Sequence, residues 1–182
     1  MQRVQIAAAL LLLSISTVGC TSKEERARVL HSQAVEARKA GDSVKEEELV
    51  LQIVHDYPST TAGAEAKKEL AEIQFNKEVL VSNTVGNVRL IIAGQVLFLT
   101  AHGRYARDLE ELCADRRGGF DRHFLDPQKG YRYEMTAEDD KFLVTATPTL
   151  STLQKHFFAD NSGLVHEEGG KPASLESPLT TY

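Results

Sequence analysis

Two cysteines and six histidines are the side chains of this chain that could supply a nucleophile or a soft metal ligand. A nucleophilic Cys113 would need a histidine beside it to raise its thiolate fraction, and His102 and His123 lie eleven and ten residues away in the sequence. No catalytic signature surrounds Cys113, so we interpret it as a structural, semi-buried thiol. The histidines show neither i, i+4 pairing nor an HExxH pattern, and we therefore expect no zinc site. They are His31, His55, His102, His123, His156 and His166.

The other cysteine, Cys20, directly follows an export-type leader. Arg3 makes the first residues positive, and Ile6–Ile15 is an apolar run interrupted only by a serine. A bilayer-spanning helix needs roughly 20 apolar residues, so this run has the length of a cleaved signal peptide. The sequence Thr17-Val18-Gly19-Cys20 resembles the lipobox of bacterial lipoproteins, although Thr17 stands where leucine is usual. The alternative is an ordinary secretory signal that is cleaved elsewhere, with Cys20 incidental.

The lipobox resemblance implies a modification and a location. Cleavage between Gly19 and Cys20 would leave a diacylglyceryl thioether on Cys20 and a further acyl chain, such as palmitate, on its amine. Two or more acyl chains anchor a protein stably. Thr21 is not the aspartate that favours inner-membrane retention, so we expect an outer-membrane lipoprotein. An acylated Cys20 cannot pair with Cys113, which leaves oxidative dimerisation through Cys113 as the remaining disulfide chemistry.

Composition excludes two classes of partner. The chain has 182 residues and a net charge of −5, and removal of residues 1–19 takes away only Arg3, which leaves 20 basic and 26 acidic side chains and a charge of −6. Without a basic block, the protein is a poor candidate for binding nucleic acid or for electrostatic docking on an anionic membrane. There is no tryptophan and only 7% of residues are aromatic, so we expect a core of mostly aliphatic side chains.

The residues behind Cys20 predict a helical hairpin. Ser22 and Glu25 have the spacing of a capping box, and Gly41 is suited to the C′ position of the helix that they begin. Ser43 and Glu46 repeat that spacing at the start of a second helix. The expected apolar positions are Ala27, Leu30, Ala34 and Ala37 in the first helix and Val50, Ile53, Val54 and Tyr57 in the second. So short a connection requires two antiparallel neighbours.

Residues 22–75 resemble, loosely, a tetratricopeptide-type repeat. The resemblance rests on the Tyr57-Pro58-Ser59 junction, the hairpin before it and the spaced alanines after it; Glu46 departs from the small apolar residue usual in that family. No second copy is present, and such repeats need stacked neighbours to bury their faces. The resemblance therefore implies a spacer or docking element, and a generic helical hairpin is the alternative.

A third helix is predicted from Thr61 to His102, which is about 63 Å if unbroken. Because that length exceeds the diameter of a small domain, we expect a kink near 82–84 or at Gly86. The later apolar positions keep steps of three and four and should pack along a sheet. They are Val81, Val85, Val88, Ile92, Val96 and Leu99.

After Gly103 the pattern changes to short helices, turns and alternating strands. Tyr131, Tyr133 and Met135 alternate with polar residues. Phe142, Val144 and Ala146 do the same, which predicts a hairpin. Phe157-Phe158, a turn at Asn161-Ser162-Gly163 and Leu164-Val165 predict another strand pair, with its aromatic side chains in the core. Three to four antiparallel strands on one long helix make an α+β domain.

Three segments of this half together resemble the soluble part of type IV pilins and type II secretion pseudopilins. They are AGQVLFLTAHGRYARDLEEL (93–112), DPQKGYRYEM (126–135) and FLVTATPTLSTLQKHFFADNSGLVHEE (142–168), and the resemblance covers roughly residues 84–175. It implies a long helix that ends in a Gly-aromatic turn, a Pro-containing loop and an antiparallel meander. Some pseudopilins bind calcium at such loops. The oxygen donors here are Asp121, Asp126, Glu138, Asp139 and Asp140, which we interpret as solvated turn charges.

The chain departs from the pilin pattern at its N-terminus. Polar helices stand where a pilin has its apolar assembly helix, and no segment after residue 20 is long and apolar enough for a filament core, so we do not expect a conventional filament subunit. The predicted organisation is a signal peptide (1–19), a tetratricopeptide-like hairpin (20–80), a pilin-like α+β domain (81–170) and a loosely ordered tail (171–182).

The sequence thus predicts a non-catalytic envelope lipoprotein that needs no cofactor or metal. It would attach to the membrane through Cys20 and act with protein partners at a type IV pilus or type II secretion machine. The alternative is a tetratricopeptide-like scaffold lipoprotein in outer-membrane or envelope assembly.

Overall fold

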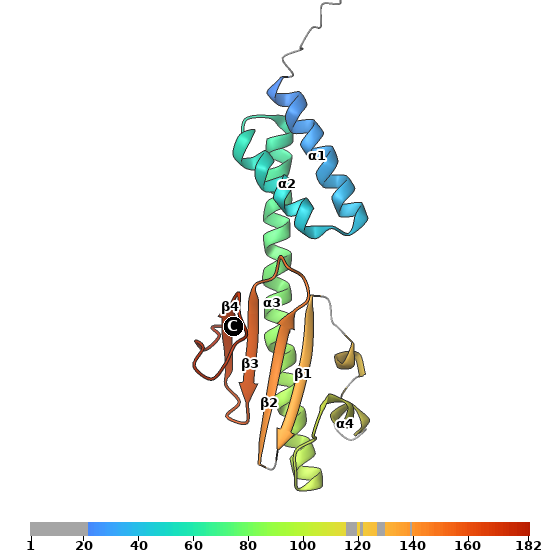
Figure 1. Ribbon diagram of the computed structural model, residues 1–182, viewed down its shortest axis with the longest axis vertical. Coiled ribbons are helices and arrows are strands. Elements are labelled where there is room, and N and C mark those ends of the chain that lie inside the picture. Colours follow the sequence, from blue (N-terminus) through green and yellow to red (C-terminus); the bar gives the residue numbers. More distant parts are fainter. Residues whose placement is uncertain (1–21, 116–119, 121, 127–129, 139) are drawn as a thin grey trace, which may run out of the picture.

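The computed structural model describes residues 22–115, 120, 122–126, 130–138 and 140–182. The chain forms three long helices, α1 (Lys23–Ala40), α2 (Ser43–Asp56) and α3 (Thr61–His102), then the short helices α4 (Leu109–Ala114) and η1 (Arg122–Leu125). The strands β1 (Tyr131–Glu138), β2 (Lys141–Pro148), β3 (Lys155–Asp160) and β4 (Val165–Gly169) follow. This confirms the predicted α+β fold with a helical hairpin, a long helix and a small antiparallel sheet (Figure 1).

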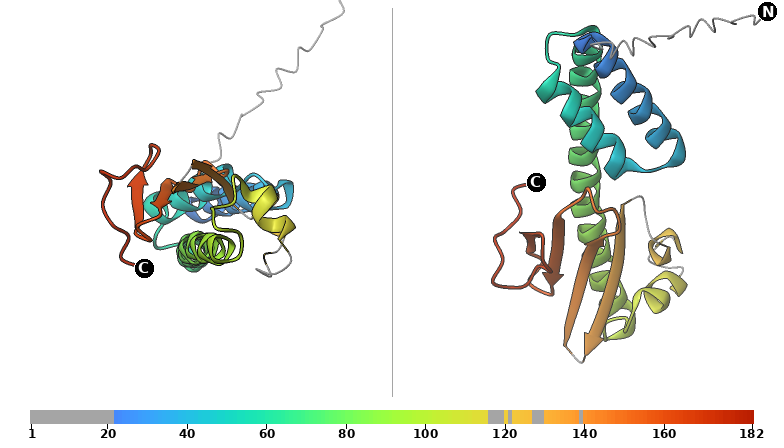
Figure 2. Two further views of the ribbon diagram at one scale, coloured as in Figure 1. Left: turned by 90° about the horizontal axis from the view of Figure 1, so that it is seen from below. Right: turned by 45° about the horizontal axis from the view of Figure 1, so that its top comes forward.

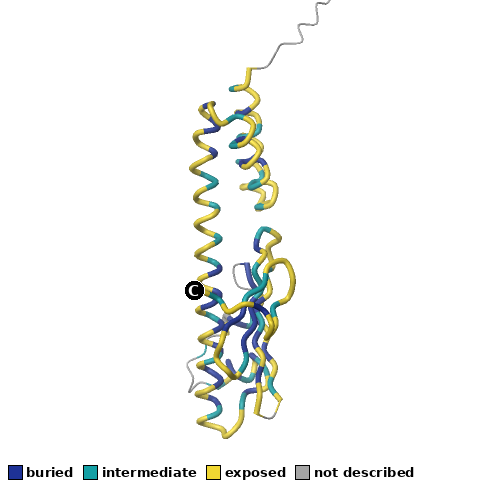
Figure 3. Tube along the Cα trace, turned by 90° about the vertical axis from the view of Figure 1, so that its left-hand side faces the viewer, coloured by how far each residue is buried: buried dark blue, intermediate teal, exposed yellow. Residues whose placement is uncertain are grey.

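The long helix α3 is the axis of the molecule. The α1–α2 hairpin packs on its N-terminal half and the sheet packs on its C-terminal half, both on the same side (Figure 3). The kink expected near residues 82–84 or Gly86 is wrong, because α3 runs unbroken over 42 residues. It contains no proline, and each half has its own core to pack against, so length alone does not force a break.

Local capping sets where the helices begin. The Ser22 side chain accepts a hydrogen bond from the Glu25 backbone N–H at 3.1 Å, as predicted. The second helix is capped by Asp42 and not by Ser43: the Asp42 carboxylate accepts from Lys45 N at 3.0 Å, and Ser43 is already helical. Asp42 can take this role because Gly41 adopts a φ of +76°, which turns the chain one residue earlier than the capping-box spacing implied.

The sheet is a four-stranded meander in the order β1-β2-β3-β4. Tyr131 pairs with Pro148 at one end of the first hairpin and Glu138 with Lys141 at the other. Alternate residues of β1 and β2 are buried against α3, as the period-2 pattern predicted. The tail continues this order: Thr180 N donates to Val165 O at 2.9 Å and Glu167 N donates to Pro178 O at 2.8 Å, so the tail lies along the free edge of β4.

The two ends of α3 belong to separate cores. The hairpin core contains Ala27, Ala34, Leu49, Val50, Ile53, Ala62 and Ala66. The sheet core includes Val85, Val88, Ile91, Phe98, Tyr131, Tyr133, Phe142, Val144 and Phe157. We call the two halves the hairpin lobe and the sheet lobe. Figure 2 shows the hairpin lobe at one end of α3 and the sheet lobe at the other.

The predicted apolar stripe of α3 is correct up to Val88 and only partly correct beyond it, where Ile92 packs on the sheet core but is only partly buried. Ile91 is buried where Ile92 was expected, and Val96 is 52% exposed. The position that points into the core is Gln95, whose polarity hid it from a hydrophobic pattern. One consequence is that the side of α3 away from the sheet carries more apolar surface than the sequence pattern predicted.

The composition of α3 also corrects an expectation. By length and composition α3 is apolar enough to cross a membrane, since an 18-residue window within it has a mean hydropathy of 1.4. The expectation that no segment after residue 20 is long and apolar enough is therefore wrong. However, 39% of that window is buried within the molecule, which is the pattern of a core helix that is covered on one side only.

Candidate functional site

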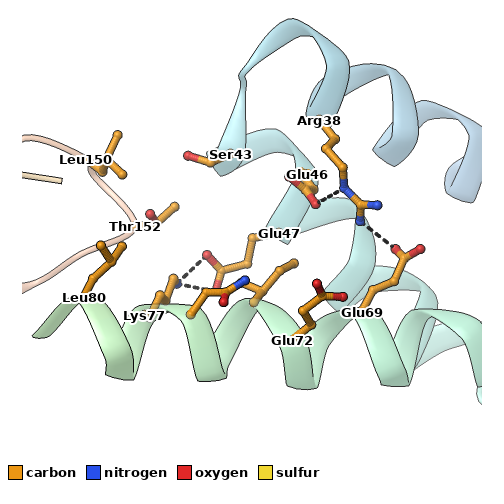
Figure 4. A pocket seen from close by; sticks show the side chains of 12 residues that line it. Arg38, Ser43, Glu46, Glu47, Glu69, Glu72, Lys77, Leu80, Leu150 and Thr152 are labelled. Carbon is orange, nitrogen blue, oxygen red and sulfur yellow. Dashed lines mark hydrogen bonds and ion pairs between the residues drawn. The ribbon is translucent and has the colours of Figure 1, made fainter. Parts of the chain in front are cut away.

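A polar groove lies where the two lobes approach each other. Its volume is about 370 Å³, and it is lined by α1, α2, α3 and the loop between β2 and β3. Leu80, Leu150 and Thr152 lie on the sheet side, and charged side chains line the hairpin side (Figure 4). The hairpin-side residues are Arg38, Ser43, Glu46, Glu47, Glu69 and Glu72.

Arg38 joins all three helices of the hairpin lobe. Its Nε donates to Glu46 Oε1 at 2.6 Å, and its Nη2 lies 3.2 Å from Glu69 Oε2. The hydrogen bond to Glu46 raises the pKa of Arg38 above its usual range, against a smaller opposing effect of burial. The other oxygen of Glu69 contacts His31 Nε2 at 3.0 Å. These contacts attach α1 to α2 and to α3, in addition to the packing of small apolar side chains between the helices.

Lys77 makes the second ionic link of the groove. Its Nζ donates to both carboxylate oxygens of Glu47 at 2.6 Å, which joins α2 to α3 at the point nearest the sheet lobe. Glu72 points into the groove and makes no ion pair with any residue that the structure describes (Figure 4). Four glutamates against Arg38 and Lys77 leave the lining with a net charge of −2.

This groove offers no evident catalytic chemistry. Its lining contains Ser43 and Thr152 hydroxyls but no cysteine or histidine, and no base lies on either hydroxyl. Three of the carboxylates, those of Glu46, Glu47 and Glu69, are held in ion pairs with Arg38 or Lys77. The arrangement is suited to fixing the hairpin on α3.

The sequence-predicted thiol and imidazoles do not form a site in the described part of the chain. Cys113 is buried in the sheet core beside α3. His102 pairs with Asp115 at 2.8 Å, and His55 pairs with Asp56 at 2.7 Å. His166 lies under the tail with its Nδ1 2.7 Å from Ser177 O. The His102 and His55 contacts lie at the ends of α3 and α2, and the His166 contact holds the tail.

The structure describes only some of the oxygen donors that were considered for calcium. Among the residues that the structure describes, no group of three or more histidine, cysteine or carboxylate side chains could hold a metal ion. Asp121 and Asp139 lie outside the described residues. The Asp160–Gly163 segment is a turn, as predicted: Ser162 N donates to Asp160 Oδ1 at 2.8 Å, and Gly163 has a φ of +78°.

The aromatic pairs are core residues, as predicted. Tyr131 and Phe157 pack against each other with tilted rings whose centroids are 5.8 Å apart. Burial raises the pKa of Tyr131 strongly, with smaller contributions from nearby Tyr133, Tyr182 and Glu167. Phe158 is buried on the other side of the sheet, with its ring against that of His166.

Two polar clusters escaped the sequence reasoning. Gln95 is fully buried, and its amide both donates to Ala106 O and accepts from Ala106 N at 2.8 Å, which fixes the turn after α3. Glu111 binds Arg104 at 2.6 Å and accepts from the backbone N–H of Arg107 at 2.7 Å. A glutamine within an apolar helical run and alternating charges after Gly103 were the only signals of these contacts.

The predicted lipidation site is not part of the described structure, because Gly19 and Cys20 both precede residue 22. The described chain begins with α1 three residues after Cys20, at the hairpin end of the molecule. Compared with models of known protein families, with curated proteins and with solved structures, the chain shows no match to any of them.

Proposed function

We propose that this chain is a non-catalytic lipoprotein of the bacterial cell envelope. Cleavage between Gly19 and Cys20 would leave an acylated Cys20 in the outer membrane, with the folded part facing the periplasm or the cell surface. The sheet lobe would contact a protein partner of the type IV pilus or the type II secretion machine. The protein would act by positioning and binding, without a cofactor.

The observation that carries this proposal is the order of the lobes along α3. An anchor on Cys20 would sit three residues before α1, at the hairpin end. The sheet lobe lies at the opposite end of a helix that is about 63 Å long. Such a molecule would hold its sheet lobe away from the bilayer, where a partner could reach it.

The long helix against a four-stranded meander supports the pilin-like part of the proposal. The order of long helix, loop region and antiparallel meander is the one that the resemblance implied. It is a fold-level analogy, and a fold does not fix a function.

A second candidate is a tetratricopeptide-like scaffold in envelope assembly. The α1–α2 hairpin favours it, since the two helices lie side by side and pack on α3. Yet the described part of the chain contains a single such hairpin, whereas these repeats need stacked neighbours to bury their faces, which favours the first proposal over the second.

Fatty-acid labelling of the full chain tests the anchor. Cells that express the chain are fed an alkyne-tagged palmitate; we expect label on the wild type and on Cys113→Ser, and none on Cys20→Ser. Cys113→Ser is a matched control because Cys113 is the only other cysteine. Label on Cys20→Ser, or a wild-type chain that is unlabelled and released on gentle lysis, would contradict the proposal.

The partner is tested by a pull-down from detergent-solubilised envelopes. Pilus or secretion components in the eluate of the wild type support the first candidate, whereas outer-membrane assembly components support the second.

A further inference from the structure

The side of α3 that faces away from both lobes is an apolar strip. We call it the outer face of α3 and define it by seven exposed residues, which fall within about 80° of arc at 100° per residue. They are Val79, Ser82, Gly86, Leu90, Ala93, Leu97 and Thr100. Leu90 and Leu97 are each 55% exposed. Figure 3 shows this side of α3 bare along its length, with the hairpin and the sheet both on the other side.

The outer face carries almost no charge, although 26% of the residues in the chain are charged. Between Val79 and Ala101 the only charged residue is Arg89, which lies beside the strip at 100° per residue and whose guanidinium donates to Tyr182 O at 2.6 Å. Two copies of this acidic protein would repel each other across most of their surfaces. Across this strip, no like charges would face each other.

Gly86 has no reason within the molecule to be glycine. A Cβ at this position would meet nothing within 4 Å, and its backbone is ordinary helix. Glycine in a helix interior costs about 1 kcal/mol relative to alanine. The small residues Ser82, Gly86 and Ala93 lie along one side of the strip, and Val79, Leu90 and Leu97 lie along the other. A surface of this shape lets a second helix approach closely.

We propose that the outer face of α3 binds the same face of a second copy, with the two helices parallel and both hairpins at one end. A lipid surface fits the strip less well, because helices that lie in a membrane interface carry large apolar residues on one face and lysine or arginine on the other. The small residues of the strip favour a helix over a lipid surface as its binding partner. The parallel orientation rests on the proposed function, since copies anchored through Cys20 in one membrane share their hairpin end.

The area of the strip sets the strength of this contact. From Val79 to Thr100 it runs about 32 Å, and with a helix width of about 10 Å each copy offers roughly 320 Å². Stable dimers bury about 800 Å² per partner. The contact is therefore weak in dilute solution and forms when copies are concentrated on a shared membrane, where tethering raises their effective concentration.

Site-specific photocrosslinking in cells tests this pairing. A photoreactive phenylalanine analogue replaces Leu90 or Leu97 in the full chain, and Leu164, which is 50% exposed on the turn after β3, is the matched control. We expect an adduct of twice the mass of the chain from Leu90 and Leu97 but not from Leu164. Two differently tagged chains expressed together should both appear in that adduct.

The orientation and the surface are then tested separately. Mapping the adduct from Leu97 should place the linked residue near Ala93–Thr100 of the other copy; a link near Val79–Gly86 would mean antiparallel helices and would overturn the parallel pair. Gly86→Leu should weaken the adduct about tenfold, because the added side chain separates the helices. Gln74→Leu, an exposed substitution on another side of α3, should leave the adduct unchanged.

Three results would overturn the pairing: no adduct from Leu90 and Leu97, adducts with lipid or with a different protein only, or an unaltered adduct in Gly86→Leu. Failure of the lipid anchor is recognised independently, from the absence of palmitate label on the wild type. If the anchor is present, Cys20→Ser should reduce the adduct because the copies are no longer concentrated at a membrane.

Discussion

The two lobes share one helix but are stabilised in different ways. The buried residues of the hairpin lobe are mostly small, with four alanines among the seven core residues that the structure describes. Those of the sheet lobe include six aromatic side chains. The hairpin lobe thus depends on close approach of backbones and on ion pairs, whereas the sheet lobe depends on filled volume.

This difference determines which changes each lobe tolerates. Removing atoms from the sheet core leaves a cavity, and the cost grows with the volume lost. Adding atoms to the hairpin core forces its helices apart, because tightly packed interiors cannot absorb even one methyl group without a shift. Four substitutions test this contrast, in order of decreasing effect.

Phe157→Ala should have the largest effect. Phe157, in β3, is buried in the sheet core, and removal of its ring should lower the free energy of unfolding by about 3–5 kcal/mol. Phe75→Ala makes the same chemical change at a side chain that is 63% exposed on α3, and should change that free energy by less than about 0.5 kcal/mol. Urea denaturation followed by circular dichroism measures both, and equal losses would mean that the sheet core does not depend on volume.

Gln95→Leu should follow. The variant keeps the size of the side chain but removes both hydrogen bonds to Ala106, which leaves one buried backbone N–H and one buried C=O without a partner. Each such group costs about 1–3 kcal/mol, so we expect a loss of about 2–4 kcal/mol in unfolding free energy. Gln74→Leu, at an exposed position of the same helix, is the control. A stabilised Gln95→Leu would show that the polar contact is dispensable in this core.

Gly63→Ala tests the hairpin lobe by adding an atom to its packing instead of removing atoms. A Cβ at Gly63 would lie 2.1 Å from Tyr57 O, so α3 would have to move away from the preceding turn. We expect a loss of about 1–3 kcal/mol. Gly86→Ala, where nothing lies within 4 Å, should instead gain about 0.5–1 kcal/mol. Thermal unfolding of the two variants measures both stability changes. Changes of the same sign in Gly63→Ala and Gly86→Ala would contradict close approach at Gly63.

The acid dependence of Glu111 should have the smallest effect. Hydrogen bonds from Arg104 and from the Arg107 backbone lower the pKa of Glu111 from 4.5 to about 2. A carboxylate with a lowered folded-state pKa contributes stability that is present above pH 4.5 and is lost as the pH falls toward 2. The difference in unfolding free energy between the wild type and Glu111→Gln should therefore shrink over this window. Glu110→Gln, its exposed neighbour, serves as the reference, and a difference that stays constant from pH 7 to pH 2 would rule out this ion pair as a stabilising contact.

The sequence by itself determined the elements of this protein. Period-3.6 and period-2 patterns, with Ser22 and Gly41 at the ends of α1, predicted α3 from Thr61 to His102 and the strand pairs after Gly130. These signals are local, because a helix or strand repeats the same geometry from residue to residue. The lipobox resemblance at Cys20 is likewise a local signal, and its consequence for the cell remains the proposal stated above.

Only the tertiary structure decided which sides of those elements meet. It made α3 continuous, turned Gln95 inward where Val96 was expected, and left the outer face of α3 bare. It also brought Arg38 to Glu69 and Lys77 to Glu47 across about thirty positions of sequence. The physical reason is that packing and ion pairing join residues that are far apart in the chain. A glutamine or an arginine finds its partner only when the whole fold places that partner within hydrogen-bond distance.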